Sequence, residues 1–397
     1  MTLKKLFLFV LAIAILLPVA VNASSSRYMG IGGPGTDYII YDASNPGIYP
    51  SLTHKYQKLL GIEYSGAGAA WDHTLVYCVW DFEGKSAIKF ILDSSPSSMF
   101  DVTSDNLFAG MTQNGNFHML SMVYGRPMGD DFDFGVALRY EGKSFAQDEI
   151  PSVQSKIDAS YSSFGLSLGI TALEKNLDAT LGVDFAGFSR DEGSTTVLEN
   201  DGSMRLTLQG RYWYKYSDTN TLVPHLRFVN HKYGAKYGSA GTTTTVAASE
   251  TVTDLILGLG HNWKPVDACL IVFELGFESY GTECDDGTNT TTDSRSDIYW
   301  RAGGETRING WLNGRLGAVR QWRGVTEEMM SGTNTYETTY GYSTTTIYCG
   351  GTFYYHRLYI DFLVEPDFLK YGPSFIGGDS GSGLASKVSM FYNFGKD

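Results

Sequence analysis

Apolar and polar residues alternate with a period of two along most of this chain. Between residues 132 and 140, large apolar side chains alternate with small or charged ones. The same alternation occurs over residues 164–170, 177–185 and 271–277. Successive side chains of a strand point to opposite faces, so this pattern predicts half-exposed β-strands rather than helices.

Period-two segments recur throughout the chain and predict sixteen strands. They fall at residues 58–65, 73–81, 85–93, 116–125, 130–141, 162–173, 177–188, 202–216, 219–232, 249–263, 266–280, 297–308, 311–324, 342–355, 356–366 and 384–394.

The predicted connections alternate between short and long. The clearest short one is Asn309-Gly310, a dipeptide that favours a tight hairpin. Short turns at one end and long polar loops at the other are typical of outer-membrane barrels, whereas a soluble sandwich has no reason to separate them. We therefore predict an all-β fold, a closed antiparallel transmembrane β-barrel of about 16 strands. Fourteen is the alternative, since barrels take even numbers and strand 58–65 has an uncertain partner. The long loops are expected at residues 94–115, 142–161, 189–201, 233–248, 281–296, 325–341 and 367–383.

The last strand supports this fold. In residues 387–394, apolar residues alternate with Lys387, Ser389 and Asn393, and the strand ends on Phe394. This arrangement resembles the closing strand of Gram-negative outer-membrane β-barrel proteins, whose terminal aromatic residue is read by the barrel-assembly machinery. Here a tail, residues 395–397, follows the phenylalanine. The resemblance implies the cell outer membrane as location, with its lipids and lipopolysaccharide as partners.

The N-terminus predicts export. Lys4 and Lys5 precede an uncharged run over residues 6–21. Small residues at the usual spacing of a cleavage site follow and end near Ala23. Residues 1–23 therefore read as a secretory signal peptide. An uncleaved anchor is the alternative, although the run is slightly short for a spanning helix. The barrel is expected to occupy residues 56–394.

Between signal peptide and barrel lies a Gly/Pro-rich segment, residues 24–55, that cannot form a strand ladder or a long helix. Its residues 42–46, Asp-Ala-Ser-Asn-Pro, resemble the N-terminal region of the long-chain fatty acid transporter family. That resemblance implies a plug inside the barrel and hydrophobic substrates, although that family's barrel has fourteen strands. A disordered periplasmic extension is the alternative.

Composition narrows the functional classes. The chain has 46 glycines, 14% aromatic and only 18% charged residues, which suits strands with one apolar and one wet face. Its net charge of -13 argues against a nucleic-acid partner. The four cysteines show no metal-binding spacing and are expected to be free thiols, so no metal or other cofactor is predicted. Residues 377–383 look like the nucleophile loop of trypsin-like proteases, but a solvated Gly/Ser loop is expected there, and no enzyme activity is predicted.

Charged residues at inward positions suggest a function. A charged side chain that faced lipid would cost about 2–4 kcal/mol near the membrane midplane, so these residues are expected to point to water or to partners. We predict a porin-like channel for passive diffusion of small hydrophilic solutes, in which the basic residues contact permeating anions. The alternatives are a plugged barrel for hydrophobic compounds and a non-conducting surface or structural protein. The predicted pore-lining residues are Arg139, Arg205, Arg211, Lys215, Arg227, Glu274, Glu278, Arg301, Glu305, Arg307, Asp361 and Glu365.

Overall fold

A computed structural model describes most of the chain. Glu365, the predicted signal peptide, the tail and the loop at residues 367–383 lie outside the described residues. Within the described part, no helix is both long and apolar enough to cross a membrane. The described residues are 27, 29, 31, 38–42, 44–56, 58–65, 73–82, 85–93, 116–147, 157–192, 195–238, 245–285, 289–331, 334–364 and 385–394.

One continuous antiparallel sheet contains all the described strands. Two short 3-10 helices, η1 (Asn45–Gly47) and η2 (Pro50–Tyr56), precede it. The strands are β1 (Leu59–Ser65), β2 (His73–Phe82), β3 (Ser86–Asp93), β4 (Asn116–Pro127), β5 (Asp133–Gln147), β6 (Ile157–Ala172), β7 (Leu177–Glu192), β8 (Thr195–Asn200), β9 (Ser203–Tyr212), β10 (Tyr214–Lys215), β11 (Asn220–Gly238), β12 (Thr245–Val266), β13 (Cys269–Asp285), β14 (Asn289–Asn309), β15 (Leu312–Ser331), β16 (Asn334–Tyr355), β17 (Leu358–Val364) and β18 (Ala385–Asn393).

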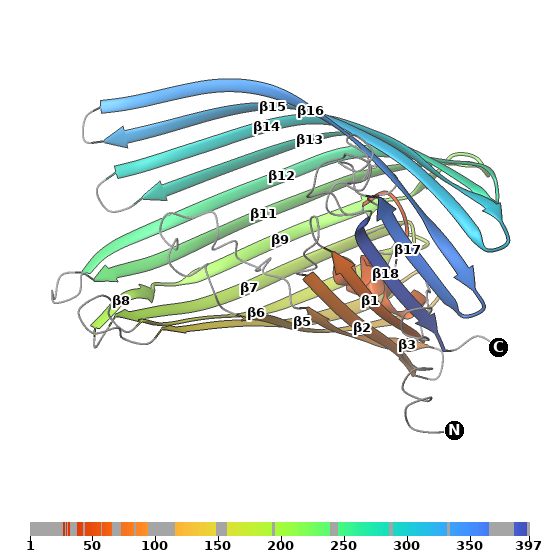
Figure 1. The fold of residues 1–397 in the computed structure, drawn as a ribbon, viewed down its shortest axis with the longest axis horizontal. Coiled ribbons are helices and arrows are strands. Elements are labelled where there is room, and N and C mark those ends of the chain that lie inside the picture. The colour runs from red at the N-terminus through yellow and green to blue at the C-terminus, as the bar shows by residue number, and fades with distance from the viewer. Residues whose placement is uncertain are drawn as a thin grey trace, which may run out of the picture.

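The sheet closes on itself. β1 pairs with β2 on one side and with β18 on the other, so the first and last strands meet (Figure 1). β8, β9 and β10 follow one another between β7 and β11 and act as one strand. Counted this way, the described strands form a sixteen-stranded barrel. The predicted fold is confirmed, and the fourteen-stranded alternative is wrong.

The barrel is apolar on the outside. Leu168 and Phe273, large apolar residues of the alternating segments 164–170 and 271–277, are 44% and 47% exposed. Their neighbours in sequence at inward positions, such as Ser167 and Glu274, are buried. Because side chains alternate across a strand, one register shift would turn every apolar residue inward, so this pattern fixes the register.

The strands continue past the predicted ends. β14 begins at Asn289 and β16 at Asn334, so much of the predicted loops 281–296 and 325–341 is strand. The same holds for parts of the predicted loops 142–161, 189–201 and 233–248. The added ends of β14 and β16 are rich in threonine, which favours extended backbone, but they carry no aliphatic face. Without the alternation, a polar strand resembles a loop in the sequence.

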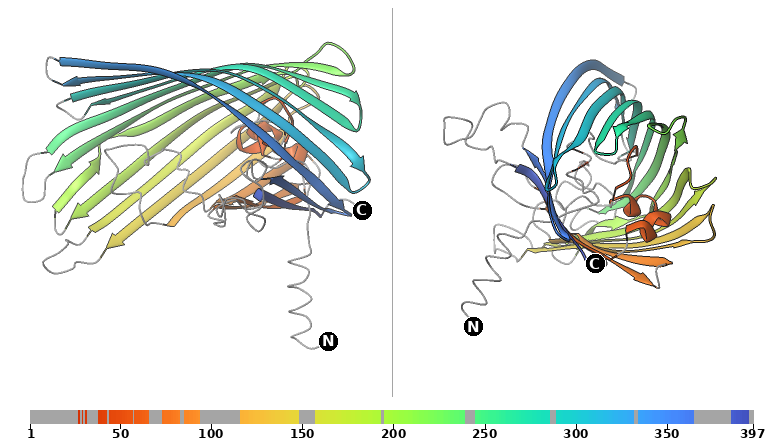
Figure 2. Two further views of the ribbon diagram at one scale, coloured as in Figure 1. Left: turned by 45° about the horizontal axis from the view of Figure 1, so that its top comes forward. Right: turned by 90° about the vertical axis from the view of Figure 1, so that its right-hand side faces the viewer.

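Residues of the N-terminal segment lie inside the barrel. Figure 2 shows η1 and η2 within the ring of strands, and η2 packs against β3, β4, β5 and β6. We call the described residues 38–42 and 44–56 the plug. Its position differs from that of a periplasmic extension.

Glycines in the inner wall make room for the plug backbone. A Cβ at Gly135 would lie 2.2 Å from the carbonyl carbon of Pro50, and one at Gly260 would lie 2.4 Å from the side chain of Ile39. Gly303 is similarly close, at 2.2 Å, to the carbonyl oxygen of Ile31. Only a residue without a Cβ allows such close approach.

This packing predicts that Gly303→Val displaces the N-terminal segment. Overpacking of this kind costs about 1–3 kcal/mol, and the added side chain would strike backbone rather than a flexible group. Limited proteolysis of the folded barrel should cut the N-terminal segment faster in this variant. Gly304→Val is the matched control, because a Cβ there meets its nearest atom only at 3.4 Å. Equal cleavage rates in the two variants would contradict the prediction.

Candidate functional site

The plug is anchored to the wall by one arginine. Arg211 of β9 is fully buried, and its Nε donates to Oδ2 of Asp178 on β7 at 2.9 Å. Its Nη1 donates to the carbonyl oxygens of Tyr38 and Ile40, both at 3.1 Å. Its Nη2 donates to Oδ1 of Asn45 at 2.9 Å. A single guanidinium therefore joins two strands to two parts of the plug.

Aromatic rings enclose this guanidinium. The ring centres of Tyr49 and Trp213 lie 4.5 and 4.7 Å from its central carbon, and Tyr41 lies at 5.0 Å. Tyr41 and Trp213 also stack on each other at 4.2 Å. Cation–π attraction is strongest when the cation is removed from water, as it is here. Strand pairing supplies the ion pair directly, because Asp178 lies opposite Arg211 in the sheet.

Asp178 has further partners that complete its hydrogen bonding. Trp213 Nε1 donates to its Oδ2 at 3.0 Å, and Thr171 Oγ1 donates to its Oδ1 at 2.8 Å. Thr171 also contacts the Ser51 hydroxyl of the plug at 2.8 Å. A buried carboxylate is tolerated only when it is paired and hydrogen-bonded, which this arrangement provides.

Two more wall side chains bind plug carbonyls. Gln209 Nε2 donates to the Ile48 oxygen at 2.8 Å, and Asn262 Nδ2 donates to the Ile39 oxygen at 2.5 Å. Neither Ile48 nor Ile39 lies within η1 or η2, so their carbonyls need partners other than the hydrogen bonds of a helix. The inner wall meets part of this need with polar side chains.

A neighbouring cluster centres on Glu274 of β13. Its carboxylate accepts hydrogen bonds from His225 at 2.9 Å and from Tyr299 at 2.8 Å, and it also pairs with Arg301. The His225 ring stacks on Tyr38 of the plug at 4.8 Å. The cluster therefore supports the plug from the strands next to β9, since His225 of β11 lies opposite Arg211 in the sheet.

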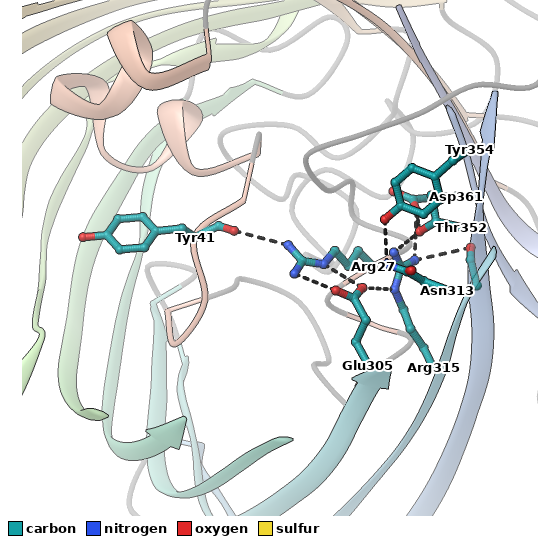
Figure 3. A network of polar contacts seen from close by, with 9 residues as sticks. Arg27, Tyr41, Glu305, Asn313, Arg315, Thr352, Tyr354 and Asp361 are labelled. Atoms are coloured by element: carbon teal, nitrogen blue, oxygen red, sulfur yellow. Dashed lines mark hydrogen bonds and ion pairs between the residues drawn. The ribbon is translucent and has the colours of Figure 1, made fainter. Parts of the chain in front are cut away.

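Arg27 forms a second attachment, shown in Figure 3. Its Nε and Nη2 each donate to the Glu305 carboxylate at 2.9 Å, and its Nη1 donates to the Tyr41 oxygen at 3.3 Å. Burial alone would lower the pKa of Arg27, but the negative charge of Glu305 and its hydrogen bonds raise it above the ordinary value. Glu305 also accepts from Arg315 at 2.5 Å, and Arg315 in turn donates to Asp361 at 2.9 Å.

The predicted pore-lining residues are mostly inward-facing but are not free to line an open pore. Arg211, Arg301, Glu274 and Asp361 are buried in the ion pairs just described, so their burial does not favour the expectation that Arg211 and Arg301 touch permeating anions, which stays a prediction. Burial beneath the plug and pairing with carboxylates are the physical reasons. Glu365 lies outside the described residues.

The other predicted residues are partly exposed and mostly paired. Arg139 and Arg205 share Asp184, so Arg205 too is neutralised rather than available to anions. Lys215 is exposed and pairs with Asp218 in the neighbouring turn, at the rim rather than in the lumen. Arg307 is exposed at the end of β14. The remaining pairs are Arg227 with Asp254, Glu278 with Arg295, and Glu305 with Arg27 and Arg315.

Sequence reasoning missed several residues of the site. Gln209 and Asn262 occupy inward positions beside predicted ones, so strand alternation could have indicated them. His225 lies two residues before Arg227 and shares its face. Arg27 precedes the barrel, and no pattern in the sequence connects it to Glu305.

Part of the inner wall is apolar. A buried cluster on β1–β5 and β18 faces the interior and includes Tyr77, Val79, Val123 and Phe391. The inner sides of β7, β11 and β12 bury further apolar and aromatic residues. These are Phe188, Val229, Tyr233 and Val252.

The described strands form a closed barrel with an apolar outer surface and leave no free sheet edge among them, which satisfies the requirements of a lipid bilayer. The protein is an outer-membrane β-barrel.

Comparisons with known proteins add little beyond this class. No family model and no curated protein matches the sequence. Solved structures that resemble it include the ferric-catecholate import receptor Fiu of E. coli K12 in its open form, with 7% identity over 84% of this chain and 81% of that chain and a TM-score of 0.36. The alcaligin outer-membrane receptor FauA of Bordetella pertussis has 8% identity over 84% and 74%, with a TM-score of 0.38.

A copper transporter, OprC, is also similar, with 8% identity over 85% of this chain and 75% of that chain and a TM-score of 0.34. Likenesses this distant do not indicate what this protein binds. The resemblance of residues 42–46 to the long-chain fatty acid transporter family finds no support in these comparisons and stays a prediction.

The anchor predicts that Arg211→Met releases the plug. Removing one partner of a buried ion pair costs about 3–5 kcal/mol, because the other charge remains buried and unpaired. Here two plug carbonyls and Asn45 also lose their donor. The double variant Arg211→Met/Asp178→Asn should regain part of the loss, since it no longer buries an unpaired carboxylate.

Limited proteolysis of residues 38–56 in the folded barrel would measure this effect. Arg320→Gln is the control, because this arginine points outward and bonds only Ser and Thr hydroxyls in the described part of the chain. A plug as protected in Arg211→Met as in the wild type would show that Arg211 is not the anchor.

Proposed function

We propose that this protein is a plugged outer-membrane transporter for small hydrophobic or amphipathic molecules. The observation that carries the proposal is the plug held inside the barrel by Arg211. An open porin needs a continuous hydrated lumen, whereas here backbone and rings occupy part of the interior. This favours the plugged barrel over passive diffusion of hydrophilic solutes.

The apolar inner wall supports the proposed substrate class. Lumens of water-filled barrels are lined by polar residues. Here Tyr77, Val79, Phe188 and Tyr233 face inward from several strands. Inner surface of this kind suits a solute with a substantial apolar part. The proposal involves no catalytic step, and its expected partners are the transported molecule and the lipids of the outer membrane.

Conductance separates this proposal from the porin. In planar bilayers, the wild type should show no steady porin-sized current, whereas Arg211→Met should show current because its plug is released. Arg320→Gln should behave as the wild type. A steady wild-type current as large as that of Arg211→Met would favour the porin instead.

Binding of a hydrophobic fluorescent probe tests the substrate class. In nanodiscs, N-phenylnaphthylamine should bind the wild type saturably above the signal of empty nanodiscs, and a fluorescent sugar should not. Val79→Asp should weaken probe binding, because it places a charge on the apolar inner wall. Saturable binding of the sugar without binding of the apolar probe would count against a hydrophobic substrate.

A further inference from the structure

Two cations of the inner wall lack the carboxylate partner that their neighbours have. In the described part of β9, β11, β14 and β15, every inward arginine except Arg307 pairs with an acidic side chain. Neither Arg307 nor Lys264 has an ion pair among the described residues. The paired arginines are Arg205, Arg211, Arg227, Arg295, Arg301, Arg315 and Arg323.

Lys264 and Arg307 line the same cavity, of about 440 Å³, at the end of the barrel where β12 turns into β13. The backbone N–H of Arg307 donates to the Ala268 oxygen at 2.9 Å, which fixes Arg307 beside this turn. Arg27 and Glu305 form another side of the cavity. The volume is within the range of small-molecule sites.

An amide in this cavity also lacks a partner. Asn313 is only 8% exposed, and its Nδ2 donates to the Tyr354 hydroxyl at 2.6 Å. Its Oδ1 is buried and has no hydrogen-bond partner among the described residues. Buried polar atoms normally have partners, and Asn313 lines the cavity, so a turn of its amide toward the cavity would bring this acceptor to a donor supplied by a ligand.

Acidic groups around the cavity restrict the ligand. Asp267 lies in the wall and carries a negative charge, while the charge of Glu305 is shared by Arg27 and Arg315. Among the described residues that line the cavity, the unpaired charges are therefore two cations and one carboxylate. A small anion fits this balance, and a large polyanion does not.

We propose that this cavity binds free hydrogen phosphate. Its negative oxygens would accept from Lys264 and Arg307, and its remaining O–H would donate to Asn313 Oδ1. Sulfate carries similar oxygens but no O–H at neutral pH, so it leaves Asn313 unpaired. This inference does not depend on the proposed function, since Lys264, Arg307 and Asn313 take no part in the Arg211 anchor that carries that proposal.

Titration calorimetry with inorganic phosphate tests the site, using the full chain in a phosphate-free maltoside detergent. Phosphate should bind about tenfold more tightly than sulfate, the value of one hydrogen bond to a charged group. Asn313→Ala should abolish this preference. Lys264→Gln/Arg307→Gln should lower the affinity for both anions at least about tenfold.

Lys215→Gln is the control, because it removes a cation from the same rim away from the cavity. Heat-modifiable migration on gels would verify that each variant is folded. Undetectable wild-type binding at about 10 mM phosphate would overturn the proposal. So would equal affinities for phosphate and sulfate, or an unchanged affinity in the double variant. A phospholipid that native mass spectrometry finds on the wild type but not on the double variant would assign the cavity to a lipid headgroup instead.

Discussion

The buried ion pair between Arg211 and Asp178 is the interaction on which the interior of the barrel depends. Two charges removed from water are stable only if they pair well and their remaining hydrogen-bonding groups are satisfied. Asp178 obtains its partners from the wall, but Arg211 obtains three of its acceptors from the plug. The wall and the plug therefore need each other, and neither can be changed at this point without leaving a polar group unpaired.

The size of the barrel explains why a plug is present. Side chains alone fill the interior of an eight-stranded barrel but cannot fill one of this width. A backbone segment adds volume, and it brings carbonyl groups that must be satisfied. Inward arginines, glutamines and asparagines satisfy some of them, while glycines such as Gly135 and Gly303 let the segment come close. The charged residues of the interior thus act first as structural partners.

Strand alternation made the architecture predictable, because an apolar lipid-facing row leaves a clear period in β5, β6 and β13. The polar ends of β14 and β16 were not predictable, since no face of them is aliphatic. The alternation of side chains along a strand also identified Arg211 and Glu274 as interior residues. Their partners came from other strands and from the plug, and no spacing in the sequence encodes such contacts. The sequence therefore predicted an open, charged pore, whereas in the structure these residues form ion pairs.

Most of the hydrogen bonds described above between wall side chains and the plug end on backbone carbonyls, those of Tyr38, Ile39, Ile40 and Ile48. A carbonyl group is present whatever the side chain, so this mode of attachment places few demands on the identity of the residues attached. During evolution, plug side chains could diversify while the docking geometry is kept. The same property makes the segment a convenient place to introduce new selectivity by engineering, with the barrel left as a constant frame.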